Sequence, residues 1–143
     1  MNRDPDAFSQ IRSETEQLFP NQKIRLQNTD NAHKVLAAEL VDGTVVEARA
    51  MSEGLLYYLA FSALRYIDGS RIFLIEEPEN GLHPARIADV MRVLRDVSKT
   101  SQVIIATHSP LVINELTSDE VTVLTRDSAG THAERIKDTP NFE

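Results

Sequence analysis

Two acidic residues and one histidine lie where apolar segments of this sequence end, and these residue types can carry out phosphate chemistry. Glu76 and Glu77 follow Ile72–Ile75, and His108 follows Val103–Ala106 further along the chain. One carboxylate can hold Mg²⁺ through its water shell, while its neighbour accepts a proton from an attacking water. A histidine at the end of the next strand can contact the transferred phosphate. The pattern therefore indicates a site rather than scattered polar residues.

The segments that position these residues read as a strand, a helix and a second strand. Ile72–Ile75 is a short apolar run that we expect to be buried on both faces, as strands of parallel sheets usually are. Pro84–Lys99 predicts an amphipathic helix, whose apolar residues recur at helical spacing: Ile87, Val90, Met91, Leu94 and Val97. Such a unit makes its two strands parallel, so both strand ends open on one edge of the sheet, where ligands bind. Glu76, Glu77 and His108 are therefore expected to lie close together.

The upstream residues predict a helix, a hairpin and a second helix. Asp4 and Pro5 can begin the first helix. Two β-rich runs joined by the two-residue turn Asp42-Gly43 predict a β-hairpin. The segment Leu55–Ile67 is apolar nearly all round, so we expect this helix to lie deep against a sheet.

The downstream residues predict the rest of a core. Strands near Val121–Leu124 and Thr131–Ile136 are expected to complete it, and the tail from Asp138 is expected to be loose.

The composition indicates one ordinary globular domain. The chain has 143 residues, 41% of them hydrophobic, which is enough for a core of its own. Its net charge of −7, without a cluster of Lys or Arg, argues against a nucleic-acid or anionic-membrane surface. The absence of cysteine excludes disulfides, a thiolate nucleophile and zinc–thiolate sites. With no secretory signal and no apolar stretch near the ~20 residues of a membrane span, a cytoplasmic protein is expected.

Each candidate feature taken alone has a simpler explanation. A Glu-Glu pair after a strand is more often a solvated helix start, and a lone histidine is more often structural. A different enzyme class also remains open, because Glu76, Glu77, Glu79, His83 and His108 could form a metal-dependent phosphoesterase site that needs no nucleotide. This interpretation is the weaker one, since Glu79 and His83 lie in a predicted turn and need not converge.

Three segments resemble motifs of one family. The run Phe73-Leu74-Ile75-Glu76-Glu77-Pro78-Glu79-Asn80-Gly81-Leu82-His83-Pro84 resembles a Walker B motif and D-loop, Ala106-Thr107-His108-Ser109-Pro110 resembles a switch-histidine motif, and Met51-Ser52-Glu53-Gly54 resembles a signature motif. Together they resemble the C-terminal half of an ABC-type ATPase head, in the RecF-like, OLD-type and SMC-related branch of AAA-type core ATPases.

This resemblance implies a role for each matching residue. Glu76 would be the metal-side carboxylate, Glu77 the catalytic base and His108 the switch histidine at the γ-phosphate. Ser52 and the backbone of Gly54, which open a helix, would meet a nucleotide held mainly by an opposing subunit. The D-loop residues that would cross the dimer interface are Asn80, Gly81 and His83. The implied cofactors are ATP and Mg²⁺.

Two positions depart from the family pattern. Glu76 stands where Asp is commoner, which shifts the metal or its water. Glu53 stands where a transporter-type signature has Gly, and an acid beside a triphosphate must turn away from it.

The resemblance also implies the fold, an α/β, P-loop NTPase-like C-terminal lobe. It would have a mainly parallel sheet with flanking helices and an N-terminal β-hairpin, in one partial ATPase domain over residues 1–143. Within it, 1–50 would hold the first helix and hairpin, 51–126 the motif core, and 127–143 a last strand and tail.

A phosphate-binding loop of the form Gly-x-x-x-x-Gly-Lys-Ser/Thr is missing from the chain. None of the five glycines precedes a lysine, so there is no Walker A segment. We therefore expect no ATP hydrolysis by this chain alone and a dependence on a P-loop half or subunit, with dimerisation through the signature and D-loop and contact with DNA only indirectly. Three explanations stay open: a fragment of a longer ATPase, one part of a split ATPase, or a degenerate, non-catalytic binding or dimerisation module.

Overall fold

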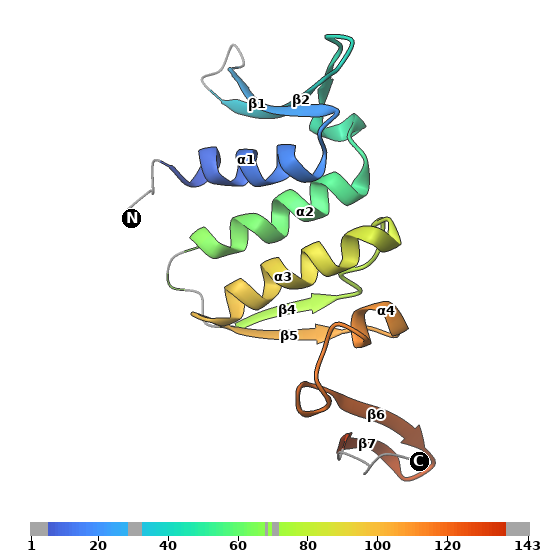
Figure 1. Ribbon diagram of the computed structural model, residues 1–143. Helices are drawn as coiled ribbons and strands as arrows, with labels where there is room; N and C mark the ends of the chain where they lie inside the picture. The colour runs from blue at the N-terminus through green and yellow to red at the C-terminus, as the bar shows by residue number, and fades with distance from the viewer. Residues whose placement is uncertain (1–5, 29–32, 68, 70–71, 137–143) are drawn as a thin grey trace.

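The computed structural model describes residues 6–28, 33–67, 69 and 72–136, and Figure 1 shows how its elements are arranged. The helices are α1 (Ala7–Leu18), α2 (Glu53–Ala63), α3 (Ile87–Ser98) and the short α4 (Pro110–Ile113). The strands are β1 (Gln22–Asn28), β2 (Lys34–Leu40), β3 (Val45–Glu47), β4 (Ile72–Glu76), β5 (Gln102–Ala106), β6 (Thr122–Asp127) and β7 (Gly130–Arg135). Single 3₁₀ turns lie at η1 (Ala48–Ala50), η2 (Leu64–Tyr66), η3 (Pro84–Arg86) and η4 (Ser118–Glu120).

Helices α1, α2 and α3 lie in layers between an antiparallel sheet and a parallel pair of strands, and α4 lies beyond the end of β5 (Figure 1). The sheet has the order β1-β2-β3, and β4 pairs only with β5 among the described strands. One buried cluster joins α1, the sheet and α2: Ile11, Ile24, Ala38, Leu55 and Leu59. A second joins α2 to α3 and α4: Tyr58, Ile87, Val90, Met91, Val93, Leu94 and Val112. The core is thus built on both sides of α2.

The position of α2 corrects one expectation. This helix was expected to lie deep against a sheet, but it lies between α1 and α3 (Figure 1). It is apolar nearly all round because its opposite sides enter the two different clusters, Leu55 in one and Tyr58 in the other. It also begins earlier than predicted, at Glu53, and gives way to a 3₁₀ turn after Ala63.

The strand–helix–strand unit is present as predicted. β4 and β5 are parallel, with Ile72 opposite Gln102 and Glu76 opposite Ala106. α3 covers one face of this pair, where Ile75 and Ile105 pack against the second cluster. The two strands therefore end at the same edge of the sheet.

The other face of β4–β5 is bare, which corrects the expectation that Ile72–Ile75 is buried on both faces. The exposed fraction is 56% for Ile72, 76% for Leu74 and 47% for Ile104. Burial alternates along both strands because no described element covers this second face. An apolar run predicts that a strand belongs between two layers, yet here only α3 supplies a layer.

The expected mainly parallel sheet is not found in the described residues. β4–β5 is the single parallel pair there, and the strands of the other two sheets pair in antiparallel fashion. β6 and β7 form a separate hairpin that does not complete the core as predicted, because nearly every residue in it is exposed. The tail from Asp138 and the residues Asp4 and Pro5 lie outside the described part of the chain.

The predicted hairpin is present with a different turn. β2 and β3 pair antiparallel, but three residues reverse the chain: Val41, Asp42 and Gly43. The N–H of Leu40 donates to the carbonyl of Thr44 at 2.8 Å, and that of Gly43 donates to the carbonyl of Leu40 at 2.9 Å. Gly43 has a φ of +84°, which glycine adopts without steric cost.

No helix in the described part of the chain is long and apolar enough to cross a membrane.

The central position of α2 makes its buried leucine a strong determinant of stability. Leu55 has no exposed surface, so Leu55→Ala should lower the free energy of unfolding by about 2–5 kcal/mol through lost burial and a cavity. Urea denaturation measures this. Leu124→Ala, at a side chain that is 67% exposed, is the matched control and should change stability by less than about 0.5 kcal/mol. Equal losses in the two variants would contradict the layered core.

Candidate functional site

The carboxyl ends of β4 and β5 bring a glutamate and a histidine into contact. The chain leaves β4 with the N–H of Glu77 donating to the carbonyl of Ala106, at 2.8 Å. The Oε1 atom of Glu77 then lies 2.7 Å from Nδ1 of His108. The imidazole is 88% exposed and the glutamate side chain only 26% exposed. The parallel register thus places the pair at one rim, as the sequence predicts.

Glu77 adopts a strained backbone conformation. Its φ is +46°, and it is the one non-glycine residue with a positive φ in the described part of the chain. Such a conformation costs on the order of 1–3 kcal/mol and is kept where the surrounding structure enforces it, commonly at functional sites. The strain directs the Glu77 side chain toward His108 at the point where the strand becomes a turn.

Glu76 lies beside this pair on the bare face. It is the last residue of β4 and alternates in step with Ile72 and Leu74, so its side chain is exposed on their side of the sheet. A hollow of about 340 Å³ runs from Glu76 and Glu77 along β4 to α2. It is lined by Tyr57, Ala60, Phe61, Leu64, Phe73, Leu74, Ile75, Glu76 and Glu77.

The carboxylates and histidines near this edge do not gather around a common metal position. Among the described residues, no three of His, Cys, Asp or Glu are arranged to hold a metal ion. The five-residue phosphoesterase site, Glu76, Glu77, Glu79, His83 and His108, is therefore not formed. Glu76 remains as a single exposed carboxylate. This suits Mg²⁺, which is often bound through one or two carboxylates together with substrate phosphates.

Glu79 has a structural contact that the sequence analysis missed. Its Oε1 atom accepts a hydrogen bond from Oγ1 of Thr107 at 2.5 Å, and Oγ1 of Thr107 in turn accepts from the N–H of Ser109 at 3.0 Å. The Oε2 atom of Glu79 is buried and has no hydrogen-bond partner among the residues that the structure describes. These bonds tie the turn after β4 to the residues on either side of His108. A Thr next to a predicted switch histidine was the available signal.

The start of α2 packs against the same turn. Ser52 is the N-cap of α2, and its Oγ accepts from the N–H of Leu55 at 3.4 Å. A Cβ on Gly54 would lie 2.8 Å from the carbonyl oxygen of Gly81, and a Cβ on Gly81 would lie 2.8 Å from Cβ of Glu53. Both glycines are therefore required for this close approach, and Gly81 also has a φ of +70°.

The side chain of Glu53 folds over the turn. Its Oε2 lies 3.0 Å from the Cβ position of Gly81, so this acid turns toward the chain's own D-loop-like segment.

Asn80 and His83 serve the turn itself in this structure. The N–H of Asn80 donates to the carbonyl of Glu77 at 3.0 Å. Nδ1 of His83 accepts from the N–H of Ala85 at 3.2 Å and so caps η3. Both residues are exposed. The predicted residues therefore fall into two groups that the turn after β4 joins. Glu76, Glu77 and His108 lie at the sheet edge, and Gly81 of the turn packs against Gly54 next to Ser52 at the start of α2.

Comparison with known families gives one match. The family model described as "AAA domain, putative AbiEii toxin, Type IV TA system" matches residues 3–114. A search of curated proteins found no match.

Solved structures share this fold at low sequence identity. One comes from work on "ATP-driven dimerization and DNA stimulated activation of SMC ATPases", with a TM-score of 0.67, 16% identity, and coverage of 91% of this chain and 85% of that chain. The Smc head domain of Pyrococcus furiosus, bound to the C-terminal domain of ScpA, gives a TM-score of 0.71 at 17% identity. It is matched over 90% of this chain and 34% of its own.

A third structure, the SMC head domain from Thermotoga maritima, gives a TM-score of 0.63 at 16% identity. The match covers 96% of this chain and 48% of that one. This chain therefore has an α/β fold similar to SMC ATPase heads, and it spans less than half the length of two of these three relatives.

The strain at Glu77 gives a prediction that needs no ligand. Glu77→Gly should raise the free energy of unfolding by about 1 kcal/mol, because glycine adopts a positive φ freely. The exposed contact with His108 that is lost contributes at most about 1 kcal/mol. Chemical denaturation measures the change.

Glu76→Gly is the matched control, since this residue is in extended backbone one position earlier. It should lower stability by about 0.5–1 kcal/mol through backbone entropy. The strain assignment is wrong if Glu77→Gly destabilises the chain as much as this control does.

Proposed function

Because the chain belongs to the AAA domain family described as "AAA domain, putative AbiEii toxin, Type IV TA system", we propose that it is the Walker B and switch-histidine part of an ABC-type ATPase, which hydrolyses ATP once a P-loop completes its site. The observation that carries this proposal is the 2.7 Å contact between Glu77 and His108 at the ends of parallel strands. Family membership and a fold similar to ATPase heads support a nucleotide-binding module.

Glu77 is the proposed catalytic base. Its Oε1 atom faces His108, which leaves Oε2 to accept a proton from the water that attacks the γ-phosphate. A positioned general base contributes roughly 10²–10⁴-fold to rate. His108 has two roles in this proposal: it holds the Glu77 carboxylate by the Nδ1 contact, and it presents Nε2 to the γ-phosphate.

Glu76 is the proposed metal-side carboxylate. The donor set fits Mg²⁺, because a single carboxylate at a strand end leaves the other coordination positions of the ion to phosphate oxygens and water. When bound, Mg²⁺ neutralises charge that develops on the transferred phosphate. Glu76 itself would hold the ion's water shell beside the hollow along β4.

The start of α2 and the D-loop-like turn form the proposed dimer contact. Ser52, Gly54, Asn80, Gly81 and His83 would face the nucleotide of an opposing subunit, in line with the family resemblance. The close approach of Gly54 and Gly81 supports this, because it fixes the helix start and the turn as one rigid unit. Backbone N–H groups at a helix start favour anions.

The proposed P-loop complement covers the bare face of β4–β5. Strands of parallel sheets are normally buried on both faces, whereas Ile72, Leu74 and Ile104 expose theirs. The sequence also lacks a lysine-bearing glycine loop. The missing layer and the missing phosphate cradle are therefore proposed to come from one structure, either another part of a longer protein or a separate chain.

A non-catalytic module is the second candidate, favoured by the missing phosphate-binding loop. The strained φ of +46° at Glu77 weighs against it, since a purely structural turn has no reason to retain a glutamate there rather than glycine.

The base assignment predicts a specific loss of turnover. The chain alone should not hydrolyse ATP, and a polypeptide that carries the P-loop should restore hydrolysis. In that complex, Glu77→Gln should lower the rate by at least about 10²-fold without weakening ATP binding. Phosphate release and nucleotide binding measure the two effects.

Glu134→Gln on β7 is the matched control and should hydrolyse ATP like the unaltered chain. Unchanged hydrolysis in Glu77→Gln would remove Glu77 as the base. Turnover by the chain alone would refute the need for a P-loop complement.

The bare face predicts a variant that loses the complement but not the fold. Leu74→Asp places a charge on a side chain that is 76% exposed, so it should change the chain's own stability by less than about 0.5 kcal/mol. Copurification with the P-loop polypeptide and restored ATP hydrolysis should both be lost, because the buried carboxylate would have no partner.

Leu124→Asp, on the exposed hairpin β6–β7, is the control and should bind the complement normally. If Leu74→Asp still copurifies with the P-loop polypeptide, the complement does not cover this face.

A further inference from the structure

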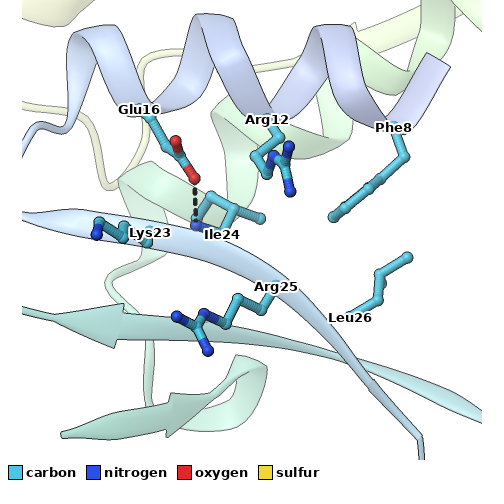
Figure 2. A pocket seen from close by; sticks show the side chains of 7 residues that line it. All are labelled: Phe8, Arg12, Glu16, Lys23, Ile24, Arg25 and Leu26. Carbon is cyan, nitrogen blue, oxygen red and sulfur yellow. Dashed lines mark hydrogen bonds between the residues drawn. The ribbon is translucent and has the colours of Figure 1, made fainter. Parts of the chain in front are cut away.

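A groove lies between α1 and β1, far along the chain from the acid pair. It is a hollow of about 520 Å³ lined by seven residues of these two elements. Figure 2 shows Phe8, Arg12 and Glu16 extending from α1 toward β1. These three residues recur at helical spacing, so one side of α1 forms a continuous wall of the groove.

The other wall is an open strand edge. β1 is the outer strand of its sheet, and the N–H of Ile24 points away from β2, because it donates to Oε1 of Glu16 at 3.0 Å. Alternate residues of an antiparallel strand direct their N–H groups the same way, so the N–H groups of Leu26 and Asn28 also point outward. Neither N–H donates to a backbone carbonyl of the described turns and loops. An open edge of this kind accepts another strand.

The groove concentrates unpaired positive charge in an otherwise acidic chain. Arg12 and Lys23 line it and form no ion pair with any residue whose position is described. Arg25 is paired with Glu39 of β2, and the one acid of the lining, Glu16, is engaged by the Ile24 amide. The whole chain carries a net charge of −7, so this groove is a local exception. Arg12 and Lys23 favour a negatively charged partner there.

The far end of the groove is apolar. Phe8 and Leu26 approach each other there from the two walls, and Leu26 is 40% exposed (Figure 2). Open main-chain groups fit a peptide better than a nucleic acid, which offers no strand to pair.

We propose that this groove binds an extended acidic peptide segment of a partner protein. The segment adds a strand to β1 over residues 26–28, where the outward N–H groups are open, places a carboxylate against Arg12, and packs an apolar side chain between Phe8 and Leu26. This inference does not rest on ATP hydrolysis, because none of these residues belongs to the proposed catalytic site.

The full chain and a fluorescent peptide of alternating Glu and Val/Leu residues test the proposal. Fluorescence anisotropy should show saturable binding of this peptide and none of its Lys-for-Glu counterpart. Arg12→Glu should weaken binding by about ten-fold, since it removes a charge-assisted hydrogen bond and adds repulsion. Arg126→Glu on β6 alters the net charge equally and should bind the peptide normally.

Main-chain pairing has its own test. Leu26→Pro removes an outward N–H without removing a bond of the β1–β2 ladder, so it should weaken binding while circular dichroism stays unchanged. Backbone NMR should show amide shifts at Leu26 and Asn28 on adding the peptide to the unaltered chain.

Three results would overturn the proposal. They are no saturable binding of the acidic peptide, equal losses in Arg12→Glu and Arg126→Glu, and binding without amide shifts at Leu26 and Asn28. Competition by short duplex DNA that Arg12→Glu abolishes would instead identify a nucleic-acid surface and would equally overturn the peptide assignment.

Discussion

The parallel register of β4 and β5 is the constraint on which the site depends. Because α3 connects these strands as a crossover, their last residues, Glu76 and Ala106, lie opposite each other. One residue further, the Glu77 N–H bonds to the Ala106 carbonyl, and two residues further His108 meets the Glu77 carboxylate. A shift of one residue in this register would direct alternate side chains to the opposite face and separate the pair.

The turn that follows β4 links the two groups of predicted residues. Glu77 and Glu79 connect it to the end of β5, through His108 and Thr107. At its other end Gly81 fits against Gly54 so closely that neither position accommodates a Cβ without displacement. A movement of this turn would therefore displace both the His108 imidazole and the start of α2. In a dimer that contacts the turn, the same path would connect the partner subunit to the carboxylate.

The sequence predicted those parts of the structure that local periodicity and spacing determine. The helical repeat from Ile87 to Val97 and two apolar runs were enough for the strand–helix–strand unit, and its geometry led to the Glu77–His108 pairing. Periodicity does not reveal what covers a strand, so the bare face at Leu74 was missed. The positive φ of Glu77 and the Glu79–Thr107 bond escaped notice for a related reason. They arise from how segments distant in sequence meet. For the Glu79–Thr107 bond, the position of Thr107 beside the predicted switch histidine was the available signal.

The bare face and the strained glutamate are consistent with a site that is prepared before it is complete. The energetic cost of holding Glu77 at a positive φ is met by the chain's own bonds, since its N–H and its side chain are both engaged within β4, β5 and the turn. An arriving P-loop layer would then bury Ile72, Leu74 and Ile104 without having to reorganise the acid pair. Burial of apolar surface drives such an association at roughly 25 cal/mol per Å² before its entropic cost. In the proposed function, assembly would therefore use the bare face of β4–β5, and catalysis would use the residues at the carboxyl ends of the same two strands.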